Sequence, residues 1–152
     1  VYYSAPDGKL DKPYQELAGY VKTKELASGE SQDVTVTFDT ESMASYCTEC
    51  ASYVMEAGTY YIRVGNSSRN THIAGAVVLD ESRAVEKVKN ICGNSGFEDL
   101  KPERNPITYE GEADEKESAK TVEIKAADLA GDCLSGSTGR NSGRAFREMG
   151  GS

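Results

Sequence analysis

The stretch from Glu56 to Ser68, EAGTYYIRVGNSS, constrains the fold more than any other part of the chain. After the turn residue Gly58, every second side chain is large and apolar, at Tyr60, Ile62 and Val64. Alternation with a period of two is typical of a half-buried strand that has one face on a core. The stretch therefore predicts a strand in the middle of a sheet, with the intervening residues on the opposite face.

Tyr60 has two interpretations. A Gly, one spacer and a Tyr at the start of a strand is the arrangement of a tyrosine corner, in which the ring packs inward and the hydroxyl bonds a nearby backbone group. Tyr60 could equally be a core aromatic without that bond. Both interpretations put the stretch inside a β-sandwich, and neither gives it catalytic chemistry.

Further short segments with strand patterns are separated by turn signals. In the clearest of them, Ser31–Asp39, the apolar residues Val34, Val36 and Phe38 alternate with Thr35 and Thr37. We expect one helical turn at Thr40–Ala44 and a hairpin-like connection at Tyr46–Ser52. Together these segments predict an all-β sandwich. The remaining expected strands are Val1–Ser4, Gly19–Leu26, Tyr53–Met55 and Ile73–Leu79.

The strand count is short at the N-terminus. A complete sandwich of this kind has about seven strands and about 100 residues, and Val1 opens the chain in apparent mid-strand. We therefore expect a fragment that lacks the opening one or two strands, with the sandwich occupying residues 1–82. Such a sandwich would expose core and an unpaired edge.

Beyond the sandwich the composition becomes more polar. Asp80–Gly93 fits either a helical stripe or an extended segment along the sandwich. Further on, only Thr121–Ile124 has strand character, among acidic runs and many Gly, Ser and Asn residues. Such a sequence buries too little apolar surface to offset its ordering entropy. We expect residues 83–130 to be a linker with a little ordered structure and residues 131–152 to be a disordered tail.

The charge of the chain excludes two classes of partner. The net charge is −8 and the pI is about 4.7, and Lys and Arg residues form no basic cluster, so no nucleic acid partner is expected. An anionic membrane surface is disfavoured for the same reason, and no apolar run reaches the roughly 18 residues that a membrane span needs. The compartment stays open, with the bacterial cytoplasm slightly favoured over secretion.

The cysteines are too sparse for a disulfide scaffold. Cys47 and Cys50 form a C-x-x-C pair, but a redox motif of that form belongs at a helix start in a βαβ context. A structural zinc needs four ligands. Cys92, Cys133 and the lone His72 could be recruited, although the chain has no second close pair. We favour inert thiols or an adventitious disulfide, and we assign no metal-binding residue.

Several acids and polar residues are weak candidates for a site. Asp7, Asp11 and Glu16 could form a carboxylate pair, but no apolar pocket is evident to raise a pKa, so solvated turn acids are favoured. His72 is expected to be an exposed loop residue. Asn66–Ser68 fits a glycosylation acceptor as well as a plain turn, and the turn is favoured.

Four tyrosines could offer stacking faces for sugar rings. They are Tyr2, Tyr3, Tyr14 and Tyr20. Packing inside the sandwich or against another domain is the favoured alternative for all four.

A series of phrases runs in order through residues 1–82. The phrases are VYYSAP (Val1–Pro6), KLDKPYQEL (Lys9–Leu17), KTKEL (Lys22–Leu26), SGES (Ser28–Ser31), VTVTF (Val34–Phe38), EAGTY (Glu56–Tyr60) and VGNSS (Val64–Ser68). In this order and spacing they resemble the fibronectin type III-like domain of family 3 glycoside hydrolases, chiefly β-glucosidases. The chain departs from that family in lacking an upstream strand pair and in carrying Tyr53 where a Trp is common.

The resemblance implies a fibronectin type III/immunoglobulin-like β-sandwich, N-terminally truncated and followed by a polar C-terminal linker. It also implies a parent enzyme that removes terminal β-D-glucosyl or similar residues by a retaining reaction, which needs two carboxyl groups about 5 Å apart. In the family these groups lie on a (β/α)8 barrel and an α/β sandwich domain. The family's Ser-Asp-Trp phrase cannot occur here because the chain has no Trp. We therefore assign no catalytic residue and no cofactor.

Two functions are open at this point. In the first, the chain is a structural module that braces the barrel and α/β sandwich domains of its parent and is inactive alone. In the second, it is a carbohydrate- or surface-binding module with weak glycan contacts. Phe97–Pro102 and Val122–Leu129 also resemble the connection found when the domain order is swapped, with the α/β sandwich first and the barrel last.

Overall fold

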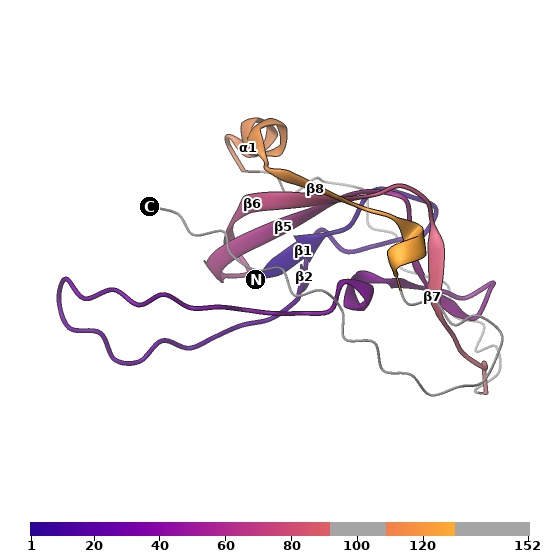
Figure 1. Cartoon of the computed structure of the whole chain (residues 1–152), viewed down its shortest axis with the longest axis horizontal. Helices are drawn as coiled ribbons and strands as arrows, with labels where there is room; N and C mark the ends of the chain where they lie inside the picture. The colour runs from indigo at the N-terminus through magenta and orange to yellow at the C-terminus, as the bar shows by residue number, and fades with distance from the viewer. Residues whose placement is uncertain (92–108, 130–152) are drawn as a thin grey trace.

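A computed structural model describes residues 1–91 and 109–129 of the chain. Its strands form two sheets, a five-stranded one in the order β2-β1-β5-β6-β8 and a three-stranded one in the order β3-β4-β7 (Figure 1). The all-β sandwich expected from the sequence is confirmed. The elements are β1 (Tyr2–Ser4), β2 (Glu16–Leu17), η1 (Thr40–Met43), β3 (Ser45–Cys47), β4 (Ser52–Met55), β5 (Gly58–Ser67), β6 (Asn70–Leu79), β7 (Arg83–Lys87), α1 (Glu112–Ser118), β8 (Thr121–Ile124) and η2 (Ala126–Asp128).

The β5–β6 hairpin is the centre of the larger sheet. Both strands are ten residues long and pair antiparallel, and β1 pairs with the other side of β5. The tyrosine corner is confirmed, because the Tyr60 hydroxyl donates to the Glu56 backbone oxygen at 3.0 Å and the side chain is fully buried. Gly58 begins the strand with φ of 136°, a conformation that glycine adopts without steric cost.

The core lies between the sheets and draws on both of them. Met55 comes from the smaller sheet and Tyr60 from the larger one, and both are completely inaccessible to solvent. Burying a side chain of this size contributes about 1.5–3 kcal/mol to stability. The helical turn expected near Thr40 is confirmed as η1, which places Met43 in the core. The full buried apolar set is Tyr3, Met43, Met55, Tyr60, Ile62, Val77, Leu79 and Leu129.

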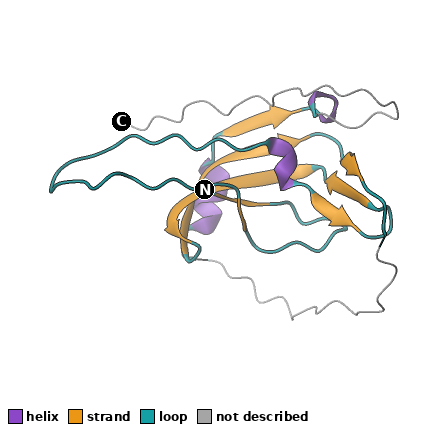
Figure 2. Ribbon diagram, turned by 90° about the horizontal axis from the view of Figure 1, so that it is seen from below, coloured by secondary structure: helices purple, strands orange, loops and turns teal. Residues whose placement is uncertain are grey.

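The prediction of strands at Gly19–Leu26 and Ser31–Asp39 is wrong. Residues 19–26 and 31–39 form no β-ladder and run instead as two extended arms that project away from the sheets (Figure 1, Figure 2). The arms lie side by side, since the Lys24 N–H donates to the Gln32 side chain at 3.0 Å and a Cβ at Gly19 would lie 2.8 Å from Val36. The chain turns between the arms at residues 28–29, where Gly29 has φ of 82°.

The two arms lie beside each other without forming a ladder, and in the described residues no core covers most of their apolar side chains. Alternating apolar residues form a strand when a neighbouring strand accepts their backbone hydrogen bonds and a core covers one face. Phe38, at the base of the second arm, packs against the core, but Val34 is 45% exposed and Tyr20 on the first arm is 82% exposed.

The sheets also include segments from beyond residue 82, where we expected the sandwich to end. The ambiguous Asp80–Gly93 segment is extended at β7, which pairs with β4. The expected strand at Thr121–Ile124 is confirmed as β8, which pairs parallel with β6 at the edge of the larger sheet. Leu129, just after η2, reaches the core. Residues 131–152, including Cys133, and Cys92 lie outside the described residues.

Removing the tyrosine-corner hydrogen bond should destabilise the fold. We expect Tyr60→Phe to lower the free energy of unfolding by about 1–3 kcal/mol, because the buried Glu56 carbonyl loses a donor. Urea denaturation followed by circular dichroism measures the change. Tyr20→Phe, on an exposed ring, is the matched control and should leave the midpoint unchanged. Equal midpoints for Tyr60→Phe and wild type would show that the bond is not stabilising.

Candidate functional site

A cleft of about 190 Å³ lies on the outer face of the larger sheet, between the loop after β1 and helix α1. We call it the Tyr14 cleft. Its lining residues are Ser4, Ala5, Pro6, Asp7, Lys12, Pro13, Tyr14, Thr59, Tyr61, Arg63 and Lys116. The floor is built by strand alternation, because Thr59, Tyr61 and Arg63 are every second residue of β5.

Arg63 joins the cleft's three structural parts. Its Nε donates to Ser4 Oγ on β1 at 2.7 Å, its Nη2 donates to Glu112 Oε1 on α1 at 2.6 Å, and its guanidinium lies 4.7 Å from the Tyr14 ring centroid. The side chain is 1% exposed, and its Nη1 has no hydrogen-bond partner among the described residues. Alternation correctly placed Arg63 opposite the core face; the loop and α1 then bury it.

Besides Arg63, the Glu112 carboxylate binds one hydroxyl and one further cation, those of Tyr14 and Lys116. It accepts from the Tyr14 hydroxyl at 2.9 Å and pairs with Lys116 at 3.1 Å. Burial alone would raise the pKa of Glu112, but the hydrogen bonds from Arg63, Tyr14 and Lys116 outweigh it and lower that pKa. Burial, followed by the bond to Glu112, raises the pKa of Tyr14. The carboxylate is therefore held ionised against the guanidinium.

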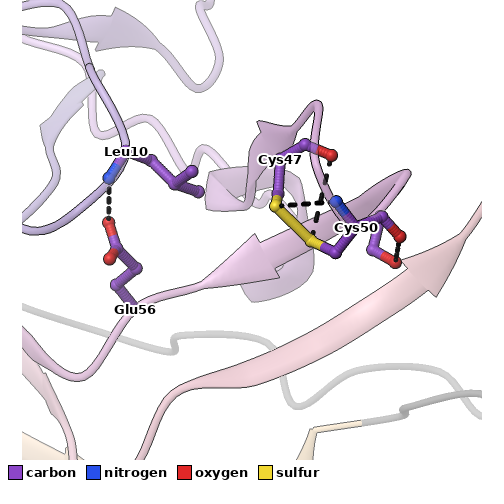
Figure 3. The surroundings of a disulfide bond; sticks show 5 residues. Leu10, Cys47, Cys50 and Glu56 are labelled. Carbon is purple, nitrogen blue, oxygen red and sulfur yellow. Dashed lines mark hydrogen bonds between the residues drawn. A yellow bond between two sulfur atoms is a disulfide. The ribbon is translucent and has the colours of Figure 1, made fainter.

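Glu56 holds the loop that forms the other wall. Its carboxylate accepts the backbone N–H groups of Lys9 at 2.8 Å and Leu10 at 3.2 Å and pairs with the buried Lys12 ammonium; Figure 3 shows the bond to Leu10. Burial would raise the pKa of Glu56, but these bonds together lower it. Gly8 lies so close that any Cβ there would overlap the Glu56 carboxylate. The loop is thus a fixed wall.

A second cluster fixes α1 to the end of β6. Glu115 accepts the Ile73 N–H at 2.9 Å and the Tyr109 hydroxyl, and it lies 2.8 Å from His72 Nδ1. The Tyr109 bond is the largest of the effects that lower the pKa of Glu115 to about 2. Burial, followed by the same bond, raises the pKa of Tyr109 to about 12. His72 is exposed but lies in β6, so the expectation of a loop residue is wrong.

The three acids named from the sequence occupy different places. Asp7 lines the Tyr14 cleft, Asp11 is exposed in the same loop, and Glu16 lies in β2. Glu16 contributes, after burial, to raising the pKa of Tyr3.

Of the four tyrosines proposed for sugar stacking, only Tyr14 lines the cleft. Tyr3 is buried in the core, Tyr2 is half-buried in β1, and Tyr20 is on the first arm. The sequence analysis did not identify Tyr61 as a lining residue. It lines the cleft only because the loop after β1 and helix α1 both lie over β5.

Cys47 and Cys50 are joined in a disulfide at the tip of the β3–β4 hairpin (Figure 3). This agrees with the disulfide interpretation and occupies both sulfurs, so neither is a free thiolate ligand for zinc. In residues 1–91 and 109–129, no group of three or more His, Cys, Asp or Glu side chains could hold a metal ion. No helix in the same ranges is long and apolar enough to cross a membrane.

A second hollow, of about 340 Å³, lies against the smaller sheet. It is lined by Asp39, Glu41, Ser42, Ala44, Tyr53, Val85 and Glu86, none of them buried. The Tyr14 cleft differs because buried side chains, Ser4 and Arg63, form part of its floor. The Tyr14 cleft is therefore the better defined of the two.

Comparison with known proteins shows which family part of the chain is similar to. A model of the fibronectin type III-like domain matches residues 1–68. Over 95 residues the chain is 42% identical to β-glucosidase A of Butyrivibrio fibrisolvens. This match covers 59% of the chain and 11% of that protein. It is 33% identical over 94 residues to a β-glucosidase of Ruminococcus albus, a match that covers 59% of the chain and 10% of that enzyme. It is 39% identical over 80 residues to an exo-α-(1→6)-L-arabinopyranosidase of Bifidobacterium breve, a match that covers 51% of the chain and 10% of that enzyme. The chain spans about a tenth of the length of these relatives.

Acid should release α1 from the sheet. Glu56, Glu112 and Glu115 all have pKa values lowered from 4.5 in the folded state, so each stabilises the fold fully above pH 4.5. That contribution is lost as the pH falls through the folded pKa, which for Glu115 is about 2. We expect the Ile73 amide to lose its protection from hydrogen exchange as the pH falls from 4.5 towards 2.

The variant Glu115→Gln isolates this effect. At pH 7 the variant should already show reduced protection of the Ile73 amide from hydrogen exchange. The additional protection that it loses in acid should be smaller than the protection that wild type loses. Glu117→Gln, on an exposed residue of the same helix, should behave as wild type. Identical acid profiles for Glu115→Gln and wild type would contradict the role of this carboxylate.

Proposed function

We propose that the chain is a non-catalytic structural module of a family 3 glycoside hydrolase, because residues 1–68 match the model of the fibronectin type III-like domain. The observation that carries the proposal is that two of its relatives are named β-glucosidases and that the match covers only about a tenth of each. In this proposal the module braces a (β/α)8 barrel and an α/β sandwich domain of the same parent chain. The parent hydrolyses terminal non-reducing β-D-glucosyl residues, and its domain order is swapped.

The chemistry of the described carboxylates supports a bracing role. Retaining glycosidases need a carboxylic acid whose pKa is raised, so that it can protonate the leaving oxygen, beside a carboxylate nucleophile. Here the buried carboxylates of Glu56 and Glu112 have lowered pKa values and are bound to Lys12 and Arg63. These acids hold a loop and a helix in place, which is what a rigid spacer requires.

A core substitution tests the bracing role in the parent enzyme. Met55→Ala should cost the module about 2–5 kcal/mol, and we expect the parent to lose activity at a lower temperature while KM at 25 °C stays unchanged. Thermal inactivation and steady-state kinetics on an aryl β-glucoside measure both. Glu117→Gln is the surface control.

The isolated chain provides the opposite test. Purified residues 1–152 should not hydrolyse the aryl β-glucoside. Turnover by the isolated chain that disappears in Asp7→Asn or Glu56→Gln would overturn the non-catalytic assignment.

We further propose that the parent supplies one or two strands that complete this sandwich beside the arms. The arms carry strand-like alternation, are extended and adjacent, and yet have no ladder among the described residues. An added strand would accept the free backbone groups of one arm and cover side chains such as Val34.

Hydrogen exchange distinguishes a completed from an incomplete sandwich. Amides in residues 19–26 and 31–39 should exchange rapidly in the isolated chain and slowly in the parent protein, since only the latter offers a partner strand. Amides of the β5–β6 ladder should be protected in both and serve as the internal control. Rapid exchange of the arms in the parent would rule out the added strand.

A further inference from the structure

The Tyr14 cleft has the size of a site for one small ring. Pockets for drug-sized ligands measure roughly 300–1,000 Å³, and this cleft is smaller, at about 190 Å³. An oligosaccharide, a peptide or a nucleotide would therefore extend well outside it. One six-membered ring with its substituents matches the space between the loop and α1.

The lining combines aromatic faces with groups that both donate and accept hydrogen bonds. Tyr14 and Tyr61 contribute rings, each with a cation over one face: Arg63 at 4.7 Å from the Tyr14 centroid and the Lys116 ammonium at 5.5 Å from the Tyr61 centroid. Thr59 contributes a hydroxyl, Lys116 a donor and Asp7 a carboxylate. A sugar ring presents apolar C–H faces to aromatic rings and hydroxyls that donate and accept at once. This mixture of lining groups suits a polyhydroxylated ring better than an apolar ligand.

The charges around the cleft favour a neutral ligand. Three cations line it, but Lys12 is paired with Glu56, and both Arg63 and Lys116 are paired with Glu112. The Lys12 ammonium also donates to the Pro6 and Leu10 carbonyls, so its three donors are occupied. With Asp7 included, each cation is matched by a carboxylate, and an anion gains no net attraction.

We propose that the Tyr14 cleft binds a single neutral pyranose ring, with Tyr61 as its apolar contact and Thr59 and Lys116 as hydrogen-bonding groups. The walls are preformed, because Glu56 fixes the loop and the Arg63–Glu112 pair fixes α1. A rigid site loses little conformational entropy on binding. This binding does not depend on the bracing role.

The test is a nuclear magnetic resonance titration of the isolated chain with methyl β-glucopyranoside, methyl β-galactopyranoside, glucuronate and sulfate. We expect saturable shifts at Thr59, Tyr61 and Lys116 with at least one neutral glycoside, and at least about tenfold weaker effects with both anions. No saturable shift with either glycoside overturns the proposal. Equal binding of sulfate overturns it as well, since the site would then be an anion site.

Matched variants tie the binding to the cleft. Tyr61→Ala should weaken binding at least about tenfold, and Thr59→Val keeps the test valid if Tyr61→Ala fails to fold. Gly8→Ala should also weaken binding, by displacing Glu56 and the loop. Tyr53→Ala, on an exposed tyrosine of the smaller sheet, should bind as wild type. Equal losses in Tyr53→Ala and Tyr61→Ala, or full binding by Thr59→Val and Tyr61→Ala, would overturn the proposal.

Discussion

One residue, Glu56, ties the sandwich core to the loop that walls the cleft. Its backbone oxygen accepts the Tyr60 hydroxyl inside the core, while its carboxylate accepts two backbone N–H groups and the Lys12 ammonium from the loop after β1. Core packing thereby fixes where the carboxylate stands, and the carboxylate fixes the loop. The absence of a side chain at Gly8 is part of the same arrangement, since a Cβ would occupy the carboxylate's position.

The second organising contact is the Arg63–Glu112 ion pair, which differs in kind from a surface pair. Lys24 and Glu30 on the arms are 61% and 38% exposed, and solvent screens pairs of that type so that they add little to stability. Arg63 and Glu112 are 1% and 3% exposed, so removal of one partner would leave a buried charge and cost about 3–5 kcal/mol. The pair therefore specifies where α1 lies more than it adds to net stability.

Local pattern predicted the parts of the fold that depend on nearby residues. The alternation around Tyr60, the turn at Gly29 and the strand at Thr121–Ile124 were readable because period-two alternation, glycine conformation and β-branched residues act locally. The same pattern was misleading at residues 31–39, since alternation reports the capacity to pair and not the presence of a neighbour.

The cleft was less accessible to sequence reasoning. Tyr14 and Asp7 were named as candidates, but Arg63 was read only as an outward residue of a strand, and Glu112 as part of an acidic run. Their pairing joins residues 49 positions apart in the chain. No local periodicity encodes such a contact, and a buried Arg can be recognised only once an acid is known to lie over it.

The parallel pairing of β8 gives the module a graded response to mechanical load. In the described chain β8 has a single neighbour, β6, and holds the edge of the sheet through four paired positions. The β5–β6 hairpin, by contrast, is paired along nearly its whole length and is flanked on both sides. Tension applied beyond Leu129 would first draw that residue from the core and peel β8 from the edge, leaving the central hairpin intact. β8 and Leu129 would thus separate before the central hairpin, and the buried Arg63–Glu112 pair would still hold α1.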